Sequence, residues 1–152
     1  MSDEVIVKRL SAQWALVVHQ HVATGDISQG MAEAFERLMA HAQASGAQFA
    51  GPPFNQYPEP PGPDFTFLVC MPVLPGATAG EGVSVEELPG GEAATLLHRG
   101  PYDQVEPSWQ RLMEWVAASG RQPAGPVREV YLNEPGTVPP DELLTEMIVP
   151  LA

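Results

Sequence analysis

The residue pattern of the first half of this chain returns in the second half at a nearly constant distance. Residues 35–39 read Phe-Glu-Arg-Leu-Met, and residues 109–113 read Trp-Gln-Arg-Leu-Met, 74 positions later (109 − 35). At the same offset Gly46 corresponds to Gly120, and residues 50–52 (Ala-Gly-Pro) correspond to residues 124–126. Residues 71–73 align with 149–151 at an offset of 78 (149 − 71), which a longer loop explains. Agreement at glycine, proline and aromatic positions predicts an internal duplication.

Each half has the sequence signals of two strands, a helix and two more strands. In the first half we expect strands at residues 4–10, 13–22, 48–57 and 65–73, the third of them interrupted at residues 51–53. In the second half we expect them at 83–88, 92–99, 127–132 and 143–149. The helices are indicated by apolar residues at helical spacing, which are Met31, Phe35, Leu38, Met39 and Ala42, then Val105, Trp109, Leu112, Met113 and Val116. Asp26 or Ser28 can cap the first helix, and Gly46 and Gly120 end the two helices.

These elements predict an α+β fold built from a duplicated β-β-α-β-β unit. We expect one fused antiparallel sheet of about eight strands, covered by two main helices, because each helix needs an apolar surface to cover. The chain of 152 residues would form a single domain of two repeats, at about residues 4–74 and 82–152. A ligand pocket is expected where the two halves meet.

The charge balance of the chain is strongly acidic. Seven Lys and Arg residues face nineteen Asp and Glu residues, for a net charge of −12. Such a domain repels phosphate backbones, so we expect no direct nucleic-acid binding. The excess charge favours cationic small molecules or a basic protein partner, although it can also serve solubility alone.

Compartment and cofactor signals are few. The chain has a single cysteine, Cys70, whose apolar neighbours predict a buried core thiol. No apolar run long enough for a membrane span is present, and no signal peptide is recognisable at the start, so we expect a cytoplasmic protein. His19 and His21 share one strand face but lack a third ligand at a sensible spacing, so no metal and no cofactor are expected.

The repeat works as an internal control for function, because positions at which the halves differ are candidates for the site. At the offset of 74, Asn55 corresponds to Glu129 and Tyr57 to Tyr131. Glu129 and Tyr131 are two apart in a predicted strand and therefore share a face, with Val130 and Leu132 directed under a helix on the other. A carboxylate beside a phenol ring is suited to a cationic ligand. Glu129 could instead be solvated or paired with Arg128 or Arg99.

Further candidates come from the same half. We include Tyr102, which follows a Gly-Pro turn, and Trp109, whose helical position suits the core or the edge of a cavity. Glu146 is a second carboxylate in a strand and could face the same cavity. His98 precedes the Gly-Pro turn, and a turn-stabilising role is favoured over catalysis. The predicted ligand-binding set is Glu129, Tyr131, Tyr102, Trp109, Glu146, Asn55 and Tyr57.

Taken in order, the second-half motifs resemble the GyrI-like small-molecule-binding domain, which is also the effector-binding domain of many bacterial AraC-type and MerR-type regulators. The motifs are residues 98–102 (His-Arg-Gly-Pro-Tyr), the helix with Trp109, residues 125–133, and a closing run from Thr145 to Pro150. The chain departs from the pattern at residues 147–148, where Met-Ile replaces a frequent aromatic residue. No helix-turn-helix segment precedes the domain, so a stand-alone form is expected.

The resemblance implies a pocket between the halves for hydrophobic, often cationic ligands, with Glu129 at the position of the pocket acid. Three functions follow as expectations. The first is a binding module for sensing or sequestering drugs or toxins. The second is a cofactor-independent hydrolase of strained, cyclopropane-bearing toxins, with Glu129 as acid or base and Tyr131 or Tyr102 bonding the leaving oxygen. The third is an acidic interaction protein that docks on a basic partner such as a topoisomerase.

Overall fold

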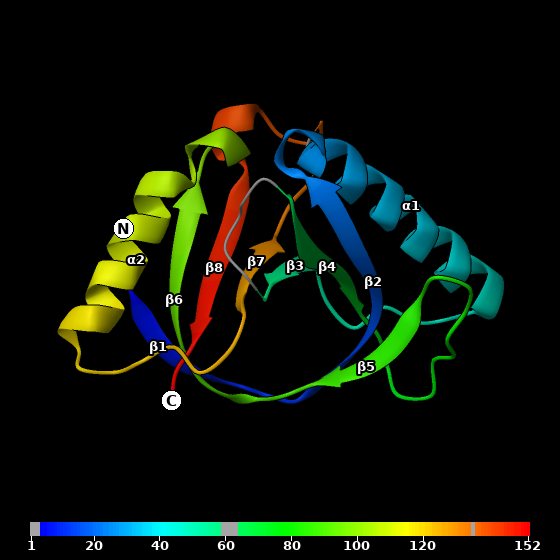
Figure 1. The fold of residues 1–152 in the computed structure, drawn as a ribbon, viewed down its shortest axis with the longest axis horizontal. Coiled ribbons are helices and arrows are strands. Elements are labelled where there is room, and N and C mark those ends of the chain that lie inside the picture. The colour runs from blue at the N-terminus through cyan, green and yellow to red at the C-terminus, as the bar shows by residue number, and fades with distance from the viewer. Residues whose placement is uncertain (1–3, 59–63, 135) are drawn as a thin grey trace. The chain divides into compact units, whose positions relative to one another are not determined.

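Strands and helices follow one another along the chain in the predicted order, two strands, a helix and two strands, repeated once. The computed structural model describes residues 4–58, 64–134 and 136–152. The described strands are β1 (Ile6–Leu10), β2 (Gln13–Ala23), β3 (Phe54–Tyr57), β4 (Asp64–Pro72), β5 (Ser84–Leu88), β6 (Gly91–Arg99), β7 (Val127–Tyr131) and β8 (Leu144–Pro150). The two long helices are α1 (Ile27–Ser45) and α2 (Glu106–Ala118), as Figure 1 shows. The predicted α+β class, with eight antiparallel strands and two main helices, is confirmed.

The chain divides into two compact units. One is Ala12–Pro89, with strand order β3-β4-β2-β5. The other is Gly90–Ala152 together with the N-terminal strand, with strand order β1-β6-β8-β7. We call them the first unit and the second unit. All the strand pairs described within them are antiparallel.

The first strand of each predicted repeat lies in the sheet of the other unit. Strand β1 pairs with β6, with Val7 opposite Ala94, and β5 pairs with β2, with Val85 opposite Leu16. The compact units therefore differ from the predicted repeats at about residues 4–74 and 82–152. Periodicity predicts that a segment forms a strand, but it does not predict which neighbouring strand that segment will pair with.

The strand registers of the two units correspond residue by residue. In the first unit, β3 and β4 pair Asn55 with Val69, and in the second, β7 and β8 pair Glu129 with Met147. Offsets of 74 (129 − 55) and 78 (147 − 69) relate these pairs, and they are the offsets that the sequence predicts for these segments. This correspondence supports the duplication, which remains an inference from the sequence.

Each helix covers one face of its own unit's sheet. Helix α1 packs Ala34, Leu38 and Ala42 against Leu16 of β2 and Val69 of β4. Helix α2 packs Leu112 and Val116 against the buried residues Ala94, Leu96, Met147 and Val149 of β6 and β8. The buried residues of both helices recur at the spacing of a helical face, which is why these segments fold as helices against a sheet. Cys70 is buried, as predicted.

Several boundaries differ from the predicted ones. The strand expected at residues 48–57 is restricted to β3, because the preceding Gly51-Pro52-Pro53 run lacks two backbone donors. The strand expected to reach residue 132 ends at Tyr131. The proline-rich composition of residues 58–63 indicates a loop, and positions 59–63 of it lie outside the described residues. Among the described helices, none has the length and apolar character required to cross a membrane.

Candidate functional site

Glu129 lies on the face of the second unit's sheet that α2 covers. It stands opposite Met147, and cross-strand partners point to the same side of a sheet. Met147 belongs to the core cluster that contains Leu112 and Val116 of α2. The expectation that Val130 and Leu132 point under a helix is therefore wrong. Val130 is buried on the opposite face, and Leu132 is exposed just beyond the end of the strand.

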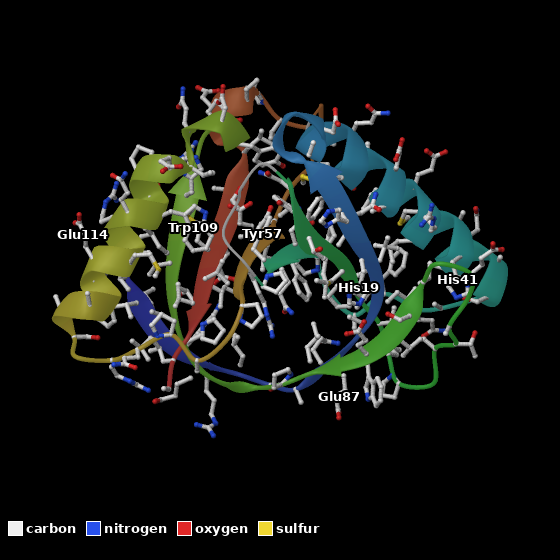
Figure 2. All side chains as sticks on the ribbon, in the orientation of Figure 1. His19, His41, Tyr57, Glu87, Trp109 and Glu114 are labelled. Atoms are coloured by element: carbon white, nitrogen blue, oxygen red, sulfur yellow. The ribbon has the colours of Figure 1, made fainter. Side chains whose placement is uncertain are left out.

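Two aromatic side chains hold the Glu129 carboxylate, one at each oxygen. The indole Nε1 of Trp109 donates to Oε2 at 2.6 Å. The hydroxyl of Tyr131 donates to Oε1 at 3.2 Å. Trp109 lies on the side of α2 that faces β6, whereas Glu114 lies on the outer side (Figure 2). The helix and the strand thus position the acid together, and the carboxylate is half-buried among rings.

Tyr102 adds a third ring, which packs against the ring of Tyr131. Its ring centroid lies 5.4 Å from that of Tyr131, in an edge-to-face arrangement with an interplanar angle of 65°. Burial raises the pKa of the Tyr102 phenol above its usual value of 10.0, so the ring stays neutral at physiological pH. Trp109, Tyr131, Tyr102 and Glu129 come together within the second unit, and we call these four residues the Glu129 site.

A tight turn brings Tyr102 to this position. Gly100 has a φ of 133°, a conformation that favours glycine, and Pro101 follows in an extended conformation. The His98 ring lies across the turn, with Nε2 at 3.2 Å from the carbonyl oxygen of Pro101. Its Nδ1 lies 2.9 Å from the Ser108 hydroxyl, in the first turn of α2. These contacts agree with the predicted turn-stabilising role of His98, and they also join the turn to the helix.

Asn55 and Tyr57 form an equivalent pair in the first unit. The Asn55 side-chain amide donates to the Tyr57 hydroxyl at 3.2 Å, and Asn55 is buried. The Tyr57 ring lies 6.1 Å from the ring of Phe67. The geometry of the acid–phenol pair is thus repeated here with a neutral amide in place of the carboxylate.

Glu146 lies on the face opposite to Glu129. It is paired with Leu97 and Val130, one residue out of phase with the Glu129–Met147 pair. Its carboxylate binds the Lys8 ammonium of β1 at 2.5 Å. The structure does not bring Glu146 together with the other candidates of this unit.

The two histidines of β2 have separate polar partners. His19 binds Glu86 of β5 at 2.8 Å, and His21 lies 3.0 Å from the Thr66 hydroxyl. Burial raises the pKa of the Glu86 carboxyl, but hydrogen bonds from Ser84 and His19 and the charge of His19 outweigh it and lower the pKa overall. Within the described residues, no three His, Cys, Asp or Glu side chains are grouped as a metal site would require.

A cavity of about 320 Å³ lies away from the predicted residues, in the first unit. Residues 45–48 at the end of α1 and residues 74–78 line it. Its lining contains no titratable side chain. We therefore assign no chemistry to it.

Comparison with solved structures supports the fold. The chain in the EcmrR–DNA complex, determined by cryo-electron microscopy, matches with a TM-score of 0.83 and 19% identity. The match covers 97% of the present chain but only 57% of the EcmrR chain. The EcmrR C-terminal domain matches with a TM-score of 0.79 and 18% identity, over 98% of this chain and 97% of that one. A hydrolase encoded by lin2189 from Listeria innocua matches with a TM-score of 0.73 and 12% identity, over 99% and 92%.

A ligand-bound structure is also similar. SAV2435 bound to tetraphenylphosphonium matches with a TM-score of 0.65 and 12% identity, over 98% of this chain and 94% of that one. At these identities the likeness concerns the fold alone.

Fold and site together define a small α+β domain that presents an acid among aromatic rings, the architecture of a small-molecule binding domain. The family model of the GyrI-like small molecule binding domain matches residues 3–152. The chain belongs to this family, as its second-half motifs indicate.

Proposed function

We propose that this chain binds a hydrophobic cation at the Glu129 site, with the carboxylate as counter-ion. The observation that carries the proposal is the carboxylate held by Trp109 and Tyr131, with the Tyr102 ring packed against that of Tyr131. Aromatic ring faces attract cations, and a positioned carboxylate adds charge attraction that a partly buried setting strengthens. The binding of tetraphenylphosphonium by SAV2435, a protein of the same fold, is consistent with this ligand class.

The test is calorimetric titration of the protein with tetraphenylphosphonium. Glu129→Gln keeps the shape of the side chain and removes its charge. Hydrogen bonds and contacts to charged groups contribute about 1.5–3 kcal/mol, so we expect the affinity to fall roughly 10- to 100-fold. Binding by Glu129→Gln that equals wild type would contradict the role of Glu129.

Glu114→Gln is the matched control for this substitution. Glu114 is exposed on the outer side of α2, so its replacement changes the net charge equally without touching the site (Figure 2). Because exposed charges are screened by salt, the control should bind within about twofold of wild type at physiological ionic strength.

A second candidate is hydrolysis of a strained, cyclopropane-bearing electrophile. The Tyr131 hydroxyl lies 3.2 Å from Glu129 Oε1, so a phenol and a carboxyl are placed to exchange a proton with a bound molecule. The hydrolase encoded by lin2189 has the same fold. Mass analysis of the compound recovered after incubation separates the two functions. An unchanged mass identifies a binder, whereas a gain of one water that Glu129→Gln abolishes identifies a hydrolase.

A further inference from the structure

Thr145 of β8 carries a buried hydroxyl next to the Glu129 site. It stands opposite Tyr131 on one side and His98 on the other, so its side chain shares the face covered by α2. Thr145 has 0% exposure. Within the part of the chain that the structure describes, its Oγ1 has no hydrogen-bond partner. A buried hydroxyl without a partner destabilises a fold, so a hydroxyl at this position calls for an explanation.

The first unit shows how the same position is filled when only packing is required. The residue equivalent to Thr145 is Phe67, because β4 pairs Phe67 with Gln20 as β8 pairs Thr145 with His98, both at an offset of 78 (145 − 67, 98 − 20). Phe67 is fully buried, and its ring contacts that of Tyr57. The second unit has a smaller, polar side chain where the first has an apolar ring.

The polar neighbours of Thr145 are bonded elsewhere. The two ring nitrogens of His98 bind Ser108 and the carbonyl of Pro101. The hydroxyl of Tyr131 is directed to Glu129. Among the described residues, the hydroxyl of Thr145 makes no hydrogen bond to either of these neighbours, although Thr145 stands opposite both of them in the sheet.

We propose that the Thr145 hydroxyl is a hydrogen-bonding subsite for an oxygen atom, hydroxyl or carbonyl, of the molecule bound at Glu129. The inference rests on the proposed binding function and narrows its ligand class. Thr145 is two residues from Met147, the partner of Glu129, which corresponds to roughly 7 Å along the strand. The preferred ligand thus combines a cationic centre with an oxygen at about that separation.

The test compares two probes that differ by one hydroxyl group, tetraphenylphosphonium and (4-hydroxyphenyl)triphenylphosphonium. Wild type should bind the hydroxylated probe more tightly. Thr145→Val keeps the shape of the side chain and removes the hydroxyl, so the affinity for the hydroxylated probe should fall roughly 3- to 10-fold, as for one neutral hydrogen bond. The affinity for tetraphenylphosphonium should stay within about twofold. An equal change for both probes, or no change for either, would overturn the subsite.

Thr95→Val is the matched control in the same sheet. Thr95 is also buried, but it lies on the opposite face, and its hydroxyl donates to the Ile6 carbonyl at 3.1 Å. Its replacement should lower the urea midpoint and leave the ratio of the two affinities unchanged. Thr145→Val should not lower the urea midpoint, and a loss equal to that of Thr95→Val would show that its hydroxyl is bonded within the fold, against the proposal.

The two proposals fail in different ways. If wild type binds neither probe, the binding function is wrong, and the subsite is rejected with it. If Glu129→Gln weakens both probes while Thr145→Val weakens neither, the cation site stands and only the subsite is rejected.

Discussion

At the scale of single residues, the contact between Trp109 and Glu129 connects the fold to the site. A helix residue that packs in the core also donates its indole N–H to the acid at 2.6 Å. Both residues can be selected from the sequence as candidates, because each differs from its counterpart in the first half. The hydrogen bond between them cannot be predicted in this way, because it depends on how α2 packs on the sheet of the second unit.

Replacing Trp109 by Phe removes this donor and introduces the residue type found at the equivalent position, Phe35. Hydrogen bonds to charged groups contribute about 1.5–3 kcal/mol, and partial exposure of both partners reduces this, so we expect a loss of about 1 kcal/mol in the free energy of unfolding. Urea denaturation measures it.

Trp115→Phe is the control on the same helix, since Trp115 is exposed. It should change the free energy of unfolding by no more than about 0.5 kcal/mol. Equal losses for the two variants would show that the indole bond to Glu129 contributes nothing to stability.

At the scale of elements, both helices end as the glycine pattern predicts. Gly46 caps α1 with a φ of 73°, and Gly120 follows α2 with a φ of 78°. Side chains with a Cβ rarely adopt this left-handed conformation. The local signal was sufficient here because a helix end depends on the residue at that position more than on distant parts of the chain.

Gly46→Ala and Gly120→Ala should each destabilise the protein by about 1 kcal/mol, because alanine is strained at positive φ. Thermal or urea unfolding measures the loss. Gly25→Ala is the control, since Gly25 has no positive φ and no atom lies near the position of its added Cβ. If all three substitutions had the same effect, the loss would not come from the left-handed conformation.

At the scale of the whole molecule, the first strand of each predicted repeat belongs to the other unit. Both ends of the sequence therefore lie in the second unit. Strand β1 is the edge strand of the second unit's sheet, and its partner β6 is about 85 residues away in the chain (91 − 6). Such pairing is non-local, and sequence periodicity carries no information about it.

A chain that lacks residues 1–10 should therefore lose stability in the second unit. Removal of β1 exposes the backbone groups of β6, so its amides should exchange hydrogen faster, whereas the amides of β2 and β4 should change little. Hydrogen exchange followed by mass spectrometry measures this by segment. Faster exchange in β2 rather than in β6 would contradict the observed pairing.

The sequence alone determined the order and type of the elements, the ends of the helices, and the shared face of Glu129 and Tyr131, because these depend on local backbone geometry and a strand period of two. The tertiary structure decided which groups meet. Register placed Glu129 opposite Met147, and the same register directs Glu146, one residue away, to the other face and towards Lys8. The packing of α2 on this sheet placed the Trp109 indole at the carboxylate, and the Thr145 hydroxyl is buried on the same covered face. These contacts are made between segments distant in the chain, and only packing brings such segments together.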